Sequence, residues 1–415
     1  MALSLIDPKE FRITAAFIIF LVSYAVFALG RLPGTKIDRP AMAVIGAVLM
    51  FACGILSPAA ALESIDFSTL VLLFSMMLIV AGLHLAGFFD WLVGWIVRRL
   101  DPKYLLPGVI FSGGILSAFL VNDVVCLFMA PLVLRVAQQM GRSPLPLLLG
   151  LATASNIGSA ASITGNPQNI LIGSLSGIGY IQFLARLGPV ALAGLFLDWA
   201  ILAWITRRSE SYDRRIPAKT PPNTAPDARL GWPLGVFVLV LIAFFAGVHP
   251  PLAAAGGAAL MLIGKNIDRQ KVFEEVDWSL LVLFTGLFLT VGGAERAGVV
   301  DDLLRITRHW NLQQPLVLTV LVAALSNIVS NVPAVMLVKN IVPAMHDPRS
   351  AWLLVSLSST LAGNLTITGS VANMIVVERT RGTLSITFWE YLKVGVPVTL
   401  STLALGWLWL ELVKY

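Results

Sequence analysis

Phe-Leu-Val-Asn-Asp-Val-Val, residues 119–125, opens the stretch that decides this fold, and Ser-Ile-Thr-Gly-Asn-Pro-Gln-Asn, residues 162–169, closes it. The first segment places Asn122 and Asp123 in the middle of an apolar run. The second is a polar, helix-breaking patch that is followed at once by more apolar residues. Polar and ionisable groups inside apolar spans are costly, so these two segments indicate a functional site.

The composition of the chain is that of a polytopic membrane protein. Its 415 residues are 57% hydrophobic and only 13% charged, and the mean hydropathy is +0.84. A soluble protein would carry about 25% charged residues. Apolar runs of membrane-spanning length predict an all-α protein with about ten transmembrane helices. The first run, residues 13–29, is a span and not a cleavable signal, and no nucleic-acid partner is expected from the net charge of +6.

The second half of the chain repeats the arrangement of the first. Ser-Asn-Ile-Val-Ser-Asn-Val-Pro (residues 326–333) again interrupts an apolar run, and Thr-Ile-Thr-Gly-Ser-Val-Ala-Asn (residues 366–373) again breaks one. Thr164, Gly165 and Asn169 correspond to Thr368, Gly369 and Asn373. We therefore predict two repeats, each with a re-entrant hairpin and a broken helix, as in many secondary transporters.

The predicted order of segments follows from these matches. N-terminal helices that could serve as a scaffold occupy 1–57, and the first repeat occupies 58–206 with its hairpin at 105–138 and its broken helix at 145–172. A polar linker spans 207–231 and further scaffold helices span 232–265. The second repeat occupies 266–415, with its hairpin at 315–344 and its broken helix at 351–377.

The basic residues predict the orientation. Placing the linker in the cytoplasm puts most of the 29 Lys and Arg residues on that side, as the positive-inside rule requires. Both termini are then extracytoplasmic. Asp66 begins its span from outside and its counterpart Asp277 begins its span from inside, so the two repeats have inverted topology. The expected location is the inner (cytoplasmic) membrane.

The breaks and tips supply the candidate binding groups. Non-helical backbone at membrane depth must be buried in protein or line a cavity, and broken helix ends offer amides to an anion and carbonyls to a cation. The predicted solute-binding residues are Asn122, Ser162, Thr164, Gly165, Asn166, Asn169, Ser330, Asn331, Thr366, Thr368, Gly369, Ser370 and Asn373. The alternative is that these residues only cap the broken helices.

Asp123 is the sharpest single candidate, because it is the only carboxylate at either hairpin tip. A carboxylate removed from water takes up a proton more readily, which makes Asp123 the predicted proton-coupling residue. The alternative role is structural, either as a helix cap or in an ion pair with Lys339.

Other classes of function find less support in the sequence. The chain contains no His-Glu-x-x-His and no Gly-x-Ser-x-Gly, and its two cysteines, Cys53 and Cys126, lack metal-site spacing. We therefore expect no enzyme activity, no metal and no cofactor. A scaffold protein would not need two matching polar breaks, whereas a channel stays an alternative because broken helices can line a pore.

These segments resemble the ion transporter superfamily, which includes arsenite efflux permeases of the ArsB type, NhaD-type sodium/proton antiporters and divalent-anion/dicarboxylate symporters. Val121-Asn122-Asp123 is similar to the first tip of arsenite permeases, and Thr368-Gly369-Ser370 resembles their Ile-Gly-Ser break. The dicarboxylate symporters have Ser-Asn-Thr at both tips, where this chain has Asp123 and Val332 in place of Thr. The segment 165–169 is closer to generic anion permeases and the antiporter branch.

The resemblance implies a secondary transporter of the cytoplasmic membrane, driven by H⁺ or by Na⁺, and it suggests a homodimer and, as in some arsenite permeases, a separate ATPase subunit. Arsenite is mostly a neutral trihydroxide near pH 7, so it suits hydrogen-bonding groups better than a strongly positive pocket. We therefore predict proton-coupled efflux of arsenite and antimonite. The alternatives are an inorganic-anion or dicarboxylate permease and a cation/proton antiporter.

Overall fold

The computed structural model describes residues 7–99, 101–206, 230–265, 267–299 and 310–413. These residues form helices joined by turns, and the only extended pairing among them is an isolated bridge between Arg31 and Asp38. The predicted all-α class is confirmed. Most of the predicted linker (residues 207–229) lies outside the described residues.

The helices occur in one order twice. The first half contains α1 (Pro8–Leu29), α2 (Arg39–Ala52), α3 (Pro58–Ser64), α4 (Phe67–Leu85), α5 (Phe88–Arg99), α6 (Leu105–Phe119), α7 (Asn122–Gln139), α8 (Pro144–Ser159), α9 (Pro167–Ser176) and α10 (Tyr180–Thr206). The second half contains α11 (Gly231–Phe245), α12 (Pro250–Ile263), α13 (Arg269–Glu274), α14 (Trp278–Arg296), α16 (Pro315–Val329), α17 (Asn331–Val338), α18 (Pro348–Ala362), α19 (Val371–Thr380) and α20 (Phe388–Leu412). The pairs α6–α7 and α16–α17 are the two hairpins, and α8–α9 and α18–α19 are the two broken helices.

Five of the described helices are long and apolar enough to cross a membrane: α1, α4, α10, α14 and α20. Four shorter apolar helices have 14 or 15 residues; one of them, α16, is a hairpin arm, and the other three are α2, α11 and α12. Together with the two broken helices, these account for the predicted set of about ten spans.

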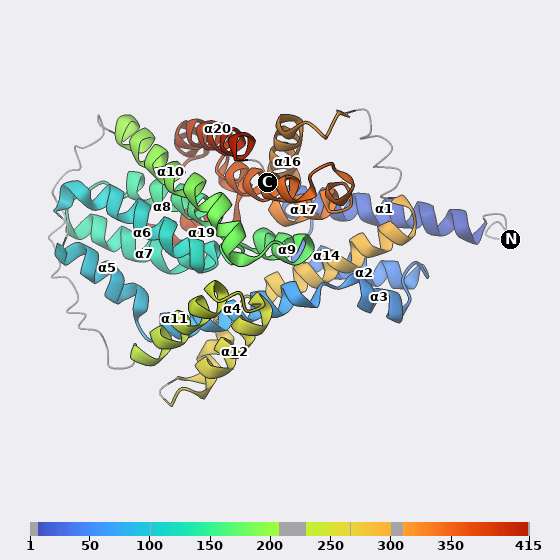
Figure 1. The fold of residues 1–415 in the computed structure, drawn as a ribbon, viewed down its shortest axis with the longest axis horizontal. Coiled ribbons are helices and arrows are strands. Elements are labelled where there is room, and N and C mark those ends of the chain that lie inside the picture. Colours follow the sequence, from blue (N-terminus) through green and yellow to red (C-terminus); the bar gives the residue numbers. More distant parts are fainter. Residues whose placement is uncertain (1–6, 100, 207–229, 266, 300–309, 414–415) are drawn as a thin grey trace.

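The two repeats interlock through their early spans. α4 packs against α12 of the second half, and α2 packs against α14. The packing is close, because a Cβ atom added to Gly286 of α14 would lie 2.5 Å from the Ala43 backbone on α2. Figure 1 shows α4, α11 and α12 gathered in one group and α1, α2 and α3 beside α14 in another. Each half thus completes the other's scaffold.

The hairpin tips turn in different ways. In the first hairpin, Leu120 and Val121 connect the helices with ordinary extended backbone. In the second, Ser330 alone makes the turn, with φ 76° and ψ 161°. That region is almost restricted to glycine and costs a non-glycine residue about 1–3 kcal/mol. The second tip is therefore held by its surroundings.

Each hairpin packs on the broken helix of the opposite repeat, α7 against α19 and α17 against α9. The arms also pack within their own repeat. α6 and α8 approach so closely that a Cβ on Gly158 would lie 2.0 Å from the Gly114 carbonyl oxygen. These contacts bring both tips and both breaks to the middle of the molecule.

The unwound segments begin earlier than the sequence predicts. They cover 160–166 and 363–370, the second with a short 3₁₀ turn at Ile367–Gly369, whereas the helix-breaking patches of the sequence are 162–169 and 366–373. The first segment also ends earlier, because proline is favoured at the first helical position and Pro167 starts α9 there. Asn169 and Asn373 consequently lie in the first turn of a helix, not in the break.

Candidate functional site

Asn156 of α8 is the centre of a buried hydrogen-bond network. Its side-chain nitrogen donates to Asn364 Oδ1 (2.8 Å) and to Asn373 Oδ1 (2.9 Å). Its side-chain oxygen accepts from Asn122 Nδ2 (3.0 Å) and from Ser370 Oγ (2.8 Å). All five side chains are buried. One amide, with its full set of partners, thus joins the first hairpin tip to both broken helices.

Thr360 of α18 stands at the position that matches Asn156. It accepts from Asn166 Nδ2 (3.2 Å) and from Gln168 Nε2 (3.0 Å) on the opposite break. Asn166 corresponds to Ser370, so the pairs Asn166–Thr360 and Ser370–Asn156 are two copies of one cross-repeat contact. These contacts fasten the two broken helices to each other.

Asn169 and Asn373 brace the breaks in the same way. Asn169 Nδ2 donates to the carbonyl oxygens of Ser159 (3.1 Å) and Ser162 (3.0 Å). Asn373 Nδ2 donates to those of the matching residues Gly363 (2.7 Å) and Thr366 (3.0 Å). Carbonyls freed by the interrupted helix thereby find partners inside the protein. For these two asparagines, the geometry agrees with the capping role that the sequence left as an alternative.

A cavity of about 200 Å³ lies where the two hairpin tips meet. Five of the predicted site residues line it: Asn122, Asp123, Ser330, Asn331 and Ser370. Four polar residues that were not predicted line it as well: Arg39, Gln168, Asp277 and Ser279. The cavity holds one cationic side chain, two carboxyl groups and several amides and hydroxyls, which is a lining suited to a small polar solute.

Asp123 faces this cavity from the start of α7. The backbone N–H of Ala372, in the first turn of α19, lies close to its carboxylate. Helix N-termini carry partial positive charge, so the start of α19 in the second repeat interacts with Asp123 of the first. The alternative ion pair with Lys339 is wrong, because Lys339 Nζ binds Glu295 Oε1 at 2.8 Å.

The second tip is fixed by Asn331 and Ser326. Ser326 Oγ donates to the Ser359 carbonyl oxygen (2.8 Å) and lies 2.5 Å from the Asn331 side chain. With its amide nitrogen toward the carbonyl oxygens of Ser359 (3.2 Å) and Gly369 (3.3 Å), Asn331 accepts from Gln168 Nε2 at 3.2 Å. At the first tip, the Asn122 backbone N–H donates to the Gly165 carbonyl oxygen (2.9 Å). Each tip therefore binds the break of its own repeat.

Four predicted hydroxyl residues do not reach the cavity. Ser162 donates to the Ala118 carbonyl oxygen, and Thr164 lies 3.0 Å from the Tyr180 hydroxyl. Thr366 and Thr368 contact each other at 3.3 Å, and Thr368 is exposed. Their solute-binding role stays a prediction without geometric support.

Gly165 and Gly369 also lie away from the cavity, where the backbone leaves no room for a side chain. A Cβ on Gly165 would lie 2.1 Å from the Ser159 carbonyl oxygen. One on Gly369 would lie 2.8 Å from the Gly363 carbonyl oxygen. Both glycines thus allow the close approach of two backbone segments in the break.

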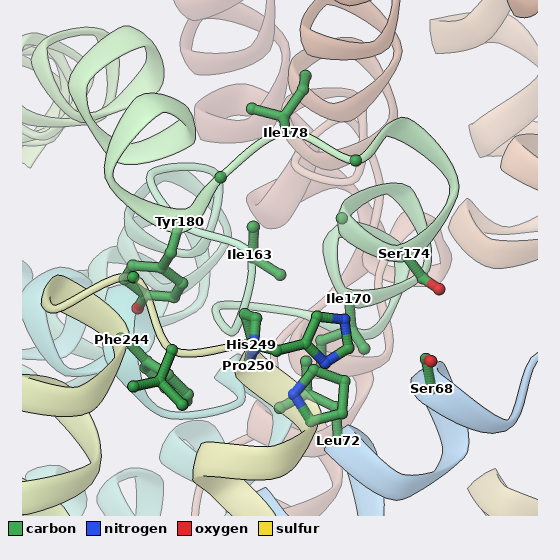
Figure 2. A pocket seen from close by; sticks show the side chains of 16 residues that line it. Ser68, Leu72, Ile163, Ile170, Ser174, Ile178, Tyr180, Phe244, His249 and Pro250 are labelled. Carbon is green, nitrogen blue, oxygen red and sulfur yellow. The ribbon is translucent and has the colours of Figure 1, made fainter.

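A second cavity, of about 350 Å³, occupies the matching place in the other repeat. Its lining includes Ser68, Leu72, Phe244, Pro250 and Pro251, where the first cavity has Ser279, Leu283, Phe27, Arg39 and Pro40, and it also includes His249. Figure 2 shows that Ile163, Ile170 and Tyr180 also line this cavity. Neither hairpin tip lines this second cavity, whereas both tips line the cavity that contains Asp277.

Several network residues escaped the sequence prediction: Asn156, Gln168, Ser356, Thr360, Asn364 and Asp198. For Asn156 and Asp198 the signal was present, since each is a strongly polar residue inside an apolar span. Thr360 carries no such signal, because hydroxyls in spans commonly bond their own helix.

Comparison with known proteins shows that the chain is similar in sequence to membrane proteins and transporters. Residues 24–356 match the family model CitMHS, described as citrate transporter. The silicon efflux transporter LSI3 of Oryza sativa is 30% identical, covering 96% of this chain and 97% of the relative. The 46 kDa membrane protein of Mycobacterium leprae is 30% identical over 95% and 98%. The putative transporter arsB of Dictyostelium discoideum is 24% identical over 94% and 90%.

Solved structures with the same fold are transporters. MtrF of Neisseria gonorrhoeae, described within a class of antimetabolite efflux pumps, aligns with a TM-score of 0.58 at 12% identity, covering 97% of this chain and 96% of MtrF. The Alcanivorax borkumensis YdaH transporter aligns with a TM-score of 0.53 at 14% identity, covering 98% of both chains. At these identities the likeness concerns the fold, and it agrees with the predicted membrane architecture.

Proposed function

The chain belongs to the citrate transporter (CitMHS) family of membrane secondary transporters, within the ion transporter superfamily, and from this premise we propose that it exports arsenite and antimonite in exchange for protons. The observation that carries the proposal is the cavity between the tips, where Asp123 lies among amide and hydroxyl groups of both repeats. A neutral trihydroxide presents both donors and acceptors, and this lining answers both.

The relatives support an efflux role for a small oxygen-rich solute. One is named a silicon efflux transporter and another a putative transporter arsB. Hydroxides of silicon and of arsenic are both small and neutral near pH 7, so one kind of pocket serves either. We propose the arsenic and antimony hydroxides because the tip sequence resembles that of arsenite permeases.

The exchange requires that the proton and the solute compete at Asp123. In its ionised form, Asp123 accepts a hydrogen bond from a solute hydroxyl. A proton on the same carboxyl removes the negative charge, which leaves a weaker acceptor and weakens solute binding. A ligand that favours one of two conformations shifts their populations by its difference in affinity, so mutually exclusive binding is enough for coupled exchange.

The positive-inside orientation places Arg39 and Asp277 at the cytoplasmic face of the inner membrane. In that orientation the cavity with Asp123 opens inward, as a solute-loading state of an exporter would. The repeat-related cavity around His249 is then its extracytoplasmic counterpart. We propose that the opposite conformation opens this second cavity to the tips.

A second candidate function is the transport of an anion such as a carboxylate. Arg39 favours it, because its guanidinium lines the cavity while Nε donates to the Phe27 carbonyl oxygen at 2.8 Å. A guanidinium is the usual partner of a carboxylate in proteins. The two carboxyl groups in the same lining oppose a dianion, which makes this the weaker of the two candidates.

The test is arsenite accumulation in everted membrane vesicles, with and without a proton gradient. We expect gradient-dependent accumulation that an uncoupler collapses. Asp123→Asn should abolish it at an unchanged amount of folded protein, whereas Asp101→Asn, which changes an exposed carboxylate, should not. Unchanged arsenite accumulation in Asp123→Asn would contradict the proposed coupling.

Two further outcomes separate the alternatives. No arsenite movement, together with uptake of citrate or sulfate into right-side-out vesicles, would replace the solute with an anion. Arsenite flux that is not accelerated by unlabelled arsenite on the far side would indicate a channel, since only a carrier shows counter-flow.

A further inference from the structure

Asp198 lies within the apolar span α10 and takes no part in the cavity. Its side chain is 0% exposed, and no other Asp, Glu, Lys or Arg among the described residues is classed as buried. An ionised carboxylate so far from water costs several kcal/mol unless it is well paired. A group of this kind inside a span calls for a functional explanation.

The Asp198 carboxyl group has a single hydrogen-bond partner. Its Oδ2 lies 3.0 Å from Thr153 Oγ1 on α8. Its Oδ1 has no partner in the described part of the chain. One hydrogen bond to a neutral hydroxyl contributes about 1 kcal/mol, far less than the burial of a full charge requires. The surroundings therefore suit a neutral, protonated carboxyl group.

The hydrogen bonds of Thr153 depend on whether Asp198 is protonated. Its Oγ1 lies 2.9 Å from the Leu149 carbonyl oxygen and 3.0 Å from Asp198 Oδ2. A hydroxyl has one proton to donate, and a carbonyl oxygen can only accept. When Asp198 is protonated, it donates to Thr153, which donates to Leu149. When Asp198 is ionised, the Thr153 hydroxyl must turn from its own helix to the carboxylate.

Two contacts connect Asp198 to the central amide network. The Thr153 carbonyl oxygen accepts from Asn364 Nδ2 (3.2 Å), and Asn364 accepts from Asn156. On the other side, the buried side chain of Tyr391 from α20 lies near both Asp198 and Asn373. The Tyr391 hydroxyl has no hydrogen-bond partner within normal distance among the described residues. Asp198 is therefore connected to groups that hold both broken helices.

Few other titratable groups surround Asp198. The helices packed against α10 are α6, α8, α11, α18 and α20. The first three carry no titratable side chain. The other two bring Arg349, Glu390, Tyr391, Lys393 and Glu411, and the interactions of Asp198 itself are with Thr153 and Tyr391. The site is thus an isolated acid with two hydroxyl neighbours.

We propose that Asp198 is a second proton-binding site, separate from the solute cavity, whose occupancy is passed to the broken helices through Thr153 and Tyr391. The ligand is a proton and not a metal cation, because hard cations take about six oxygen ligands. No group of three or more His, Cys, Asp and Glu residues that could hold a metal occurs in the described ranges. The inference deepens the proposed proton coupling and rests on it only for its transport readout.

The direct test is infrared difference spectroscopy of the purified protein in lipid nanodiscs, recorded between acidic and alkaline pH. We expect a carboxylic acid C=O band that disappears in Asp198→Asn and persists in Asp123→Asn. Thr153→Val should shift that band, since it removes the hydroxyl partner at nearly constant shape, and Thr153→Ser should restore it. These threonine variants keep the test valid if Asp198→Asn does not fold.

Two results would overturn the inference. A difference spectrum that Asp198→Asn leaves unchanged would mean that Asp198 does not titrate. A band that responds to Na⁺ at constant pH would mean that the site binds a cation other than H⁺.

The transport readout counts protons moved per arsenite in vesicles. Asp198→Asn should lower that ratio by about one proton and leave exchange at Asp123 in place. If the wild type moves no arsenite, the proposed solute fails while the infrared result still decides the proton site. If arsenite is exchanged at an unchanged ratio in Asp198→Asn, the second site fails and the proposed function stands.

Discussion

In the first repeat, the hairpin tip reads Asn122-Asp123 and the junction of the break with the next helix reads Asn166-Pro167-Gln168. The second repeat has Asn331-Val332 and Ser370-Val371-Ala372 at the matching places. The asparagines that brace the two breaks, Asn169 and Asn373, make the same contacts, since both bind carbonyl oxygens at equivalent positions. The interrupted backbone demands those bonds in both copies. The groups that face the solute are free to differ, and the carboxylate occurs in one copy only.

The two cavities differ in the same manner. Arg39 at the start of α2 corresponds to Pro250 at the start of α12, while the neighbouring residues Pro40 and Ser279 correspond to Pro251 and Ser68. Arginine is charged at every physiological pH, and proline carries no charge. An anion would therefore meet a fixed positive charge in the cavity with Arg39 that the matching position of the other cavity lacks.

The largest difference between the two breaks should come from adding one methyl group to each glycine. Gly165→Ala should lower the free energy of unfolding by about 3 kcal/mol or more, because its Cβ would overlap backbone that cannot move aside. Gly369→Ala should lower it by about 1–2 kcal/mol, since its nearest contact is looser. Thermal unfolding in detergent, followed by size-exclusion chromatography, measures both. Equal losses would show that the first break is no tighter than the second.

Substitution of the two bracing asparagines, Asn169 and Asn373, should lower the free energy of unfolding equally in the two repeats. Asn169→Ala and Asn373→Ala each leave two carbonyl groups without their partner, so both should lower the free energy of unfolding by about 2–3 kcal/mol. Asn340→Ala, which removes an exposed contact with Glu295, serves as the control and should change little. The same unfolding assay applies. A gap of more than about 1 kcal/mol between the two brace variants would contradict their equivalence.

The smallest effect on the free energy of unfolding should come from Thr164 and Thr368, which occupy matching positions in the two repeats. Thr164→Val removes a buried contact with the Tyr180 hydroxyl and should lower the free energy of unfolding by about 1 kcal/mol. Thr368→Val should stay within about 0.5 kcal/mol, since its hydroxyl is exposed. A double-mutant cycle of Thr164→Val with Tyr180→Phe measures the buried contact. Additive losses in that cycle would mean that the two hydroxyls do not interact.

The sequence predicted those features that carry a local signal. Polar residues inside apolar runs located both tips and both breaks, and their duplication predicted the repeats. Partners that come from the opposite repeat were not predictable. Whether Thr360 bonds its own helix or receives Asn166 and Gln168 depends on how α9 and α18 cross. The ion pair of Asp123 with Lys339 failed for the same reason. Lys339 binds Glu295, and the packing of α14 against the second hairpin fixes that position.

Spans of the first half pack on spans of the second, α4 on α12 and α2 on α14. This packing also constrains when the first half can fold during synthesis. When the ribosome has made the first half alone, α4 and α2 lack the surfaces on which they pack. Folding of this half must wait for the second, although multidomain chains usually mature from the N-terminus onward. The halves, expressed as separate polypeptides divided at the linker, should accumulate only when both are made in the same cell. Until the second half has been made, the incompletely packed first half is a substrate for chaperones and membrane proteases.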